Sequence, residues 1–309
     1  MSAENVQALV FPGQGSQRPG MARAWRDHPA AKRWVEAGEV LGWDVARLGT
    51  EADAEELREP AKCQIALFVH QAVLLDAWRE AGGQDPVAVA GHSLGEYDAL
   101  VAAGVLGFAE ALKLVDARAR HTQTAAAAMP GTMVACVGYP DGVVEAACAE
   151  VGVHVANDNA PGQVVVAGSA EALDTLRARL SKPAPEGDGG RPARGKVLDV
   201  NVGAAYHSPH MAPAVEPFGE ALDRVAFAEA AVPVVANVDA EPHTSAGEWP
   251  DLLRRQVVTP VRWRDSVTTF RRLGVTEVVE LGASPVLTNM VKRIDRSLQR
   301  RTVSEPEDL

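Results

Sequence analysis

The sequence has few cysteines and none of the spacings that cysteine sites need. Its 309 residues include three cysteines, which are Cys63, Cys136 and Cys148. Because they are odd in number and far apart, they match neither a disulfide framework nor a metal-binding pattern. We therefore expect a protein of the reducing cytoplasm that binds no metal.

Long apolar runs are also absent. No stretch of about 18 consecutive apolar residues occurs, so no membrane-spanning helix is expected. Residues 1–5 lack the basic start and the apolar stretch of a signal peptide. The sequence therefore predicts a protein that neither spans a membrane nor enters a secretory route.

Basic residues are outnumbered by acidic ones. The chain has 30 Lys and Arg against 41 Asp and Glu, for a net charge of −11. This excess of negative charge argues against general nucleic-acid binding. An acidic protein partner would need a local basic patch. Two clusters offer one, the first with Lys182, Arg191, Arg194 and Lys196, and the second, predicted on the last helix, with Lys292, Arg293, Arg296, Arg300 and Arg301.

What is present suits a large globular core. Hydrophobic residues make up 47% of the chain and charged residues 23%, which fits one or two domains. Strand-like apolar runs alternate with helical patterns along most of the chain. This alternation predicts an α/β fold with a mostly parallel sheet covered by helices on both faces. Expected strands lie at 6–11, 87–90, 232–237 and 276–281, and expected helices at 64–81, 96–103, 108–127, 216–225, 249–256, 261–273 and 286–296.

The pattern changes between residues 130 and 203. Its elements follow the order β-α-β-β-α-β, which is the ferredoxin-like split unit. We therefore predict a large α/β domain from residues 1–129 and 204–309, with a small ferredoxin-like α+β subdomain inserted at 130–203. Residues 182–194 are rich in proline, glycine and charge and are predicted to form an exposed loop.

Two smaller expectations concern the ends of the large domain. Trp25, Trp34 and Trp43 lie in helical stretches near the N-terminus and are predicted to be core aromatics. The chain from Thr302 onward is polar and is predicted to fray.

The strongest chemical signal is Gly91-His92-Ser93-Leu94-Gly95, which stands between an apolar strand and a helix. Gly-X-Ser-X-Gly in this setting is the nucleophile elbow. The serine must lie at the tip of a strained turn, so the residues two before and two after it must lack a clashing side chain. The following helix would point its N–H groups at a developing oxyanion. The alternative is a plain glycine-rich turn that holds an ordinary serine.

A second glycine-rich loop, residues 12–17, follows the first predicted strand. It lacks both the Lys-Ser/Thr ending of a phosphate-binding loop and the Gly-X-Gly-X-X-Gly pattern of dinucleotide sites. Its glycines let the backbone approach a ligand, and Gln14 and Gln17 offer amide donors. We interpret it as an amide-lined loop beside the nucleophile, with an ordinary strand–helix turn as the alternative.

A serine nucleophile needs a base. His207 stands in a small-residue loop just after the inserted unit, and the pattern favours it modestly over its neighbour His210. No acid between Ser93 and His207 stands at a convincing strand end. We therefore expect a Ser–His pair whose ring is oriented by a backbone carbonyl, rather than a full triad. Gln64 is the odd polar residue at the start of a strong helix, and capping is favoured over a place facing the site.

Together these segments resemble the malonyl-CoA:acyl-carrier-protein transacylases of fatty-acid synthesis and their kin, the acyltransferases of polyketide synthases. The resemblance runs in order and without large gaps from Val6 to Arg296. It rests on the motifs at 11–17, 91–96 and 206–209, on Arg118 within 113–118, on 159–168, and on Gln256 within 255–261.

The resemblance implies roles for the matching residues. Ser93 would be acylated, and His207 would be the base, with its ring held by the main-chain carbonyl of Gln256. The backbone N–H groups of Gln14 and Leu94 would form the oxyanion hole. Arg118 would bind the free carboxylate of a malonyl group through a two-pronged pair. Pocket candidates are Tyr206, Gln64 and Asn159, and the small subdomain would form the other wall of the cleft.

The resemblance also implies a function. A malonyl or related carboxyacyl group would pass from coenzyme A to Ser93, and then to the phosphopantetheine thiol of an acyl carrier protein, with the enzyme acting in trans as a monomer. Coenzyme A would enter as a thioester substrate, and no cofactor would be bound permanently. The sequence departs from the family pattern at residues 121–123 and at Tyr206, which leaves open an unusual polyketide acyl unit. The other alternative is a thioester hydrolase of the same fold, against which Arg118 argues.

Overall fold

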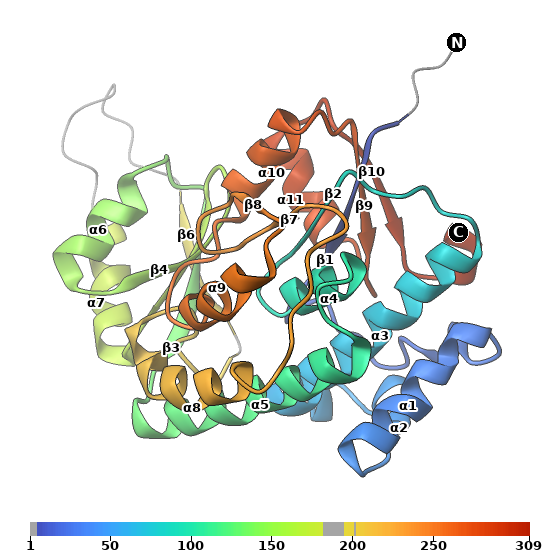
Figure 1. The fold of residues 1–309 in the computed structure, drawn as a ribbon. Coiled ribbons are helices and arrows are strands. Elements are labelled where there is room, and N and C mark those ends of the chain that lie inside the picture. Colours follow the sequence, from blue (N-terminus) through green and yellow to red (C-terminus); the bar gives the residue numbers. More distant parts are fainter. Residues whose placement is uncertain (1–4, 182–194, 201) are drawn as a thin grey trace.

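The computed structural model describes residues 5–181, 195–200 and 202–309. Two separate β-sheets organise this part of the chain (Figure 1). The loop predicted at residues 182–194, which carries Lys182, Arg191 and Arg194 of the first basic cluster, lies outside the described residues. Of the helices in the described ranges, none has the length and apolar character that crossing a bilayer requires.

The larger sheet has six strands in the order β10-β9-β1-β2-β7-β8. Its pairings are parallel except the one between β7 and β8. β1 and β2 are buried at every residue, which explains why they read as continuous apolar runs. The strands are β1 (Gln7–Phe11), β2 (Ala88–Gly91), β7 (Val234–Val235), β8 (Pro242–His243), β9 (Glu277–Leu281) and β10 (Gln299–Val303).

Each face of this sheet has its own helical cover. Leu9 and Phe11 of β1 join one apolar cluster, whereas Ala8 and Val10 join another, as the alternation of a strand requires. The first cluster includes side chains of α1 (Lys32–Leu41), α2 (Ala46–Thr50), α3 (Pro60–Glu80), α4 (Gly95–Ala102), α5 (Phe108–Ala128), α8 (Ala212–Leu222) and α9 (Trp249–Gln256), and the second those of α10 (Trp263–Arg272) and α11 (Leu287–Ile294). The predicted α/β architecture, a mostly parallel sheet between helices, is confirmed.

The smaller sheet is antiparallel, with the order β4-β5-β3-β6. With two helices it makes up the small part of the chain, which has the predicted ferredoxin-like order of elements. These are β3 (Thr132–Val137), α6 (Val143–Val151), β4 (His154–Ala160), β5 (Gln163–Gly168), α7 (Ala170–Leu180) and β6 (Lys196–Val200). Val134 and Val166 pack toward α6 and α7, whereas Met133 and Val165 join the cluster of the large part. One face of the small sheet is therefore turned toward the large sheet. The exact division at residues 130 and 203 stays a prediction.

The two parts are joined by main-chain and side-chain contacts. The N–H of Val261 donates to the carbonyl of Ala156 on β4, at 2.9 Å, and the N–H of Asp158 donates back to the carbonyl of Val261, at 3.0 Å. Nη1 of Arg293 on α11 donates to Oε1 of Gln163 at 2.7 Å. These contacts fix the β4 side of the small sheet against the large part.

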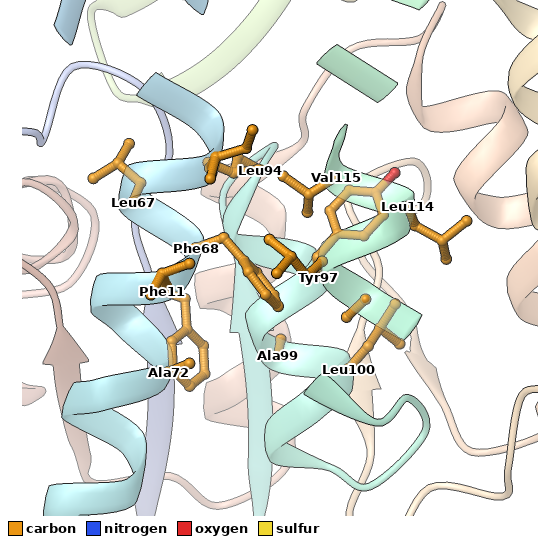
Figure 2. Close-up of a cluster of buried hydrophobic side chains, with 14 of the residues drawn as sticks. Phe11, Leu67, Phe68, Ala72, Leu94, Tyr97, Ala99, Leu100, Leu114 and Val115 are labelled. Atoms are coloured by element: carbon orange, nitrogen blue, oxygen red, sulfur yellow. The ribbon is translucent and has the colours of Figure 1, made fainter. Parts of the chain in front are cut away.

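The helix that follows Ser93 is held in the core between α3 and α5. Figure 2 shows Tyr97 and Leu100 of α4 in one buried cluster with Phe68, Leu114 and Val115. Aromatic and branched side chains on both neighbouring helices contribute to this cluster, so α4 has little freedom to move. The N-terminus of α4 is thereby fixed next to the serine.

Three predictions for the large domain are wrong. Trp43 is 39% exposed because α1 ends at Leu41 and its C-cap, Gly42, has a φ of 76° that turns the chain away from the core that buries Trp25 and Trp34. The tail does not fray, because β10 pairs with β9 and Nε1 of Trp25 donates to the carbonyl of Ser304 at 2.9 Å. Since α11 ends at Ile294, Arg300 and Arg301 lie on β10 and not on the last helix.

Candidate active site

The turn at Ser93 has the strain that an elbow requires. Its φ is 54°, in the left-handed region that residues other than glycine rarely adopt. A Cβ on Gly91 would lie 1.8 Å from the carbonyl carbon of Gly95, and a Cβ on Gly95 would lie 2.0 Å from the carbonyl oxygen of Phe11. Both glycines are therefore required by close backbone contact, and the serine is held at the tip of the turn.

His207 is the histidine that the fold brings to Ser93. Its Nε2 lies 2.7 Å from Oγ of Ser93, and its Nδ1 lies 2.8 Å from the main-chain oxygen of Gln256. His210, the rival, has its Nδ1 near Oγ of Ser208, at 3.5 Å. The structure thus has the predicted arrangement, in which a backbone carbonyl orients the histidine of a Ser–His pair and no triad is formed.

Burial keeps the imidazole neutral. Removal from water and the positive charge of Arg118 together lower the pKa of His207 to about 3, against the bond to Gln256. A neutral ring that already donates from Nδ1 has a lone pair on Nε2. It can therefore accept the proton of the Ser93 hydroxyl.

Arg118 reaches the same point from α5. Its side chain is 2% exposed, and its Nη2 donates to Oγ of Ser93 at 3.0 Å and to Oε1 of Gln256 at 3.3 Å. Its Nη1 donates to Oε1 of Gln64 at 2.5 Å. The capping role favoured for Gln64 is therefore wrong: α3 begins at Pro60, so Gln64 lies inside the helix and faces Arg118.

Two backbone N–H groups near Ser93 have the position expected of an oxyanion hole. Leu94 is the N-cap residue of α4, and Gln14 lies in the loop that packs against the elbow, where a Cβ on Gly13 would come within 2.5 Å of the carbonyl oxygen of His92. Among the hydrogen bonds of the described residues, none uses the N–H of Leu94 or Gln14. Both groups are thus available to a ligand oxygen.

A cavity of about 150 Å³ opens at Ser93 and His207 between the two sheets. Gln14, Tyr206 and Asn159 line it, whereas Gln64 and Arg118 do not. Arg118 contacts the lining residue Ser93, and Gln64 is bonded to Arg118. Asn159 of β4 also contacts Nε2 of His92, through Oδ1, at 2.8 Å. The small sheet and α11 supply an apolar wall, made by Met133, Val165, Val200, Leu287 and Met290.

Two functional residues were missed by sequence reasoning. Oδ1 of Asn237 accepts from the N–H of Ser93 at 2.7 Å, and its Nδ2 donates to the carbonyl of Gly91 at 2.6 Å, so one side chain clamps both sides of the elbow. The carboxylate of Glu96 lies behind it and accepts from the N–H of Asn237. The available signals were the place of Asn237 at the end of a predicted parallel strand and that of Glu96 in the elbow motif.

The residues present suit acyl transfer through a covalent serine ester. The Ser93 hydroxyl and the neutral ring of His207 meet at one small, largely apolar cavity, which Gln14 also lines. In the described part of the chain, no group of three or more His, Cys, Asp or Glu side chains is arranged to hold a metal ion.

Comparison with known proteins agrees with this chemistry. The family model described as acyl transferase domain matches residues 8–305. The chain is 38% identical over 308 residues to the malonyl CoA-acyl carrier protein transacylase of Salmonella typhimurium, covering 98% of this chain and 97% of that protein. It is 37% identical to the protein of that name from Bacillus subtilis, over 98% of this chain and 94% of that protein.

Solved structures give the same result. The malonyl-CoA:acyl carrier protein transacylase of Xanthomonas oryzae superposes with a TM-score of 0.91 at 38% identity, over 99% of this chain and 96% of the other. A malonyl-transacylase solved in complex with a type II polyketide synthase acyl-carrier protein superposes with a TM-score of 0.90 at 35% identity, over 98% and 97% of the two chains.

Proposed function

The chain belongs to the acyl transferase family, among its malonyl-CoA:acyl-carrier-protein transacylases, and from that premise we propose that it moves a malonyl group from coenzyme A to a carrier protein. The acceptor is the phosphopantetheine thiol of an acyl carrier protein, and the intermediate is an ester of Ser93. The carrier is a separate protein, so the enzyme acts in trans.

The first half-reaction loads Ser93. Nε2 of His207 takes the hydroxyl proton while Oγ attacks the thioester carbonyl. The negative charge that develops on the carbonyl oxygen is stabilised by the N–H groups of Leu94 and Gln14. The C–S bond then breaks, and the imidazolium returns its proton to the sulfur of coenzyme A.

The second half-reaction reverses these roles. His207 takes the proton of the carrier thiol, and the sulfur attacks the ester carbonyl of the acylated Ser93. The C–O bond breaks, and the proton passes from His207 back to Oγ. Neither half-reaction consumes a further reactant, which agrees with a site that needs no permanently bound cofactor.

Arg118 carries the assignment of a carboxyacyl substrate. It is a buried cation 3.0 Å from the nucleophile oxygen, and its side-chain partners are a hydroxyl and two neutral amides. Within the described ranges, no Asp or Glu forms an ion pair with it. A buried charge without a counter-ion is costly, and the free carboxylate of a malonyl group supplies that counter-ion.

The intact mass of the protein after mixing with malonyl-, methylmalonyl- or acetyl-CoA tests the proposal. We expect a mass gain of one malonyl group, lost when a phosphopantetheinylated carrier protein is added and stable when it is not. Ser93→Ala should slow labelling by at least about 10³-fold. Faster labelling by methylmalonyl-CoA would favour the alternative acyl unit, and loss of the group to water alone would favour a hydrolase.

Cytoplasmic location and a monomeric state belong to the proposal as well. Cys63, Cys136 and Cys148 are all unpaired and buried, which suits a reducing compartment.

A further inference from the structure

Glu96 is a buried carboxylate that faces the site from behind. It lies in the first turn of α4 and is 1% exposed. Its Oε1 accepts from the main-chain N–H of Asn237 at 2.7 Å, and its Oε2 accepts from Nε2 of Gln256 at 2.6 Å. Both oxygens therefore have donors, although neither touches a reacting group.

Gln256, the residue that Glu96 binds through its side chain, does touch reacting groups. Its main-chain oxygen holds Nδ1 of His207, its Nε2 also donates to the main-chain oxygen of Ser93 at 2.8 Å, and its Oε1 accepts from Arg118. One residue thus contacts the base, the nucleophile and the cation. The orientation of its amide decides whether Arg118 meets an oxygen or an NH₂ group.

Hydrogen-bond chemistry lets Glu96 set that orientation. Burial raises the pKa of Glu96 to about 8, but each of its oxygens accepts from an N–H donor, and these two bonds stabilise the ionised form. An amide has an accepting and a donating end, and a carboxylate only accepts. Because Glu96 binds the NH₂ end of Gln256, the oxygen end is turned toward Arg118. Without an acceptor at position 96, only the main-chain oxygen of Ser93 and Arg118 itself would oppose the reverse orientation, in which two donors meet at the guanidinium.

We propose that Glu96 is a positioning residue of the transfer reaction, which orients the Gln256 amide so that Arg118 is presented to the acyl carboxylate. The inference rests on the proposed function, because it takes Arg118 as the group that binds the malonyl carboxylate. It assigns Glu96 a part in substrate selection, exerted through Gln256.

Glu96→Gln tests this by exchanging one oxygen for an NH₂ group. The main-chain N–H of Asn237 keeps the remaining oxygen, so the new NH₂ group faces Nε2 of Gln256. Two donors then meet, which favours turning the Gln256 amide over, against its bonds to Ser93 and Arg118. We expect kcat/KM for malonyl-CoA to fall about 10- to 100-fold, mainly through KM, since a hydrogen bond to a charged group is lost. Acetyl-CoA has no carboxylate, and its acylation should fall by less than about 3-fold.

Asp98→Asn is the matched control. Asp98 lies on the same helix, is also 1% exposed, and neither of its carboxylate oxygens has a hydrogen-bond partner among the described residues. The substitution makes the same chemical change two residues away from Glu96. It should leave the ratio of malonyl to acetyl rates within about 2-fold of the wild-type ratio.

Equal losses for malonyl- and acetyl-CoA in Glu96→Gln would overturn the positioning role. This outcome differs from a failure of the proposed function. In that case the wild-type protein itself would take up no malonyl group.

Discussion

The main-chain oxygen of Gln256 accepts a hydrogen bond from Nδ1 of His207 at 2.8 Å, and this contact assigns the imidazole its tautomer. Because a carbonyl only accepts, Nδ1 carries the hydrogen, and Nε2 presents its lone pair to Ser93. A backbone carbonyl therefore does the orienting that a carboxylate does in a triad, and it places no further charge beside Arg118.

The first prediction separates the two neighbouring histidines. His207→Ala removes the group at 2.7 Å from Oγ of Ser93, so acyl-enzyme formation should slow by about 10³-fold or more. His210→Ala removes a side chain whose ring lies near Ser208 instead, and its effect should be within a few-fold. Rapid-quench labelling with malonyl-CoA measures both rates. A larger loss in His210→Ala than in His207→Ala would show that His210, and not His207, is the base.

The second prediction concerns pH. A base of ordinary pKa would gain activity as the pH rises through about 6.5, because its protonated form cannot accept a proton. Burial and Arg118 lower the pKa of His207 to about 3, so this base is already neutral well below that pH. The single-turnover rate of acylation should therefore show no step near pH 6.5.

Measuring the single-turnover rate of acylation between about pH 5 and 7 checks this prediction. A step near pH 6.5 in the wild-type enzyme would contradict the neutral, buried base. In Arg118→Ala, one cause of the lowered pKa is removed, so any step that does appear should lie at a higher pH than in the wild type.

The elbow was predictable because its causes are local. Ser93 is strained and Gly91 lacks a side chain for reasons that lie within five consecutive residues. Gly95 belongs to the same pattern, although the contact that requires it is with Phe11 on the neighbouring strand. The apolar runs of β1 and β2 were predictable for the same reason, since a strand buried on both faces needs no partner to be seen.

The contacts missed in the site are long-range. Asn237 holds a residue 144 positions away, and Glu96 is bonded to Gln256 across 160 positions. No spacing rule connects such pairs, so only the fold brings them together. In the same way β10 reads as a polar tail, because an edge strand exposes side chains and its pairing with β9 leaves no apolar pattern.

The third prediction is a change in substrate preference. Arg118→Ala removes the partner of the malonyl carboxylate, worth about 2–5 kcal/mol in a desolvated site, so kcat/KM for malonyl-CoA should fall steeply. Acetyl-CoA lacks that carboxylate and should lose much less. Arg118→Lys keeps the charge without the paired donors, so its kcat/KM for malonyl-CoA should lie between that of the wild type and that of Arg118→Ala. Comparable losses for both thioesters in Arg118→Ala would show that the residue is structural.

The last prediction concerns docking of the carrier protein. Carrier proteins are usually acidic and the chain itself has a net charge of −11, so attraction must come from a local patch. α11 borders the cavity through Leu287 and Met290. Lys292 on α11 and Arg296 just after it are exposed, and no described acidic residue pairs with either. Their neighbour Arg293 is instead bonded to Gln163.

Reversing this pair, in Lys292→Glu/Arg296→Glu, should raise the KM for carrier protein while leaving acylation by malonyl-CoA intact. The effect should shrink as salt rises, because exposed charges are screened within about 8–10 Å at ordinary ionic strength. Arg26→Glu/Lys32→Glu makes the same change of net charge at the start of α1, a region remote from α11 in Figure 1, and should have no such effect. Both half-reactions measured at low and high salt decide the question. An unchanged carrier KM at low salt would remove α11 as the docking surface, and Lys196 on β6 would be the next basic residue to reverse.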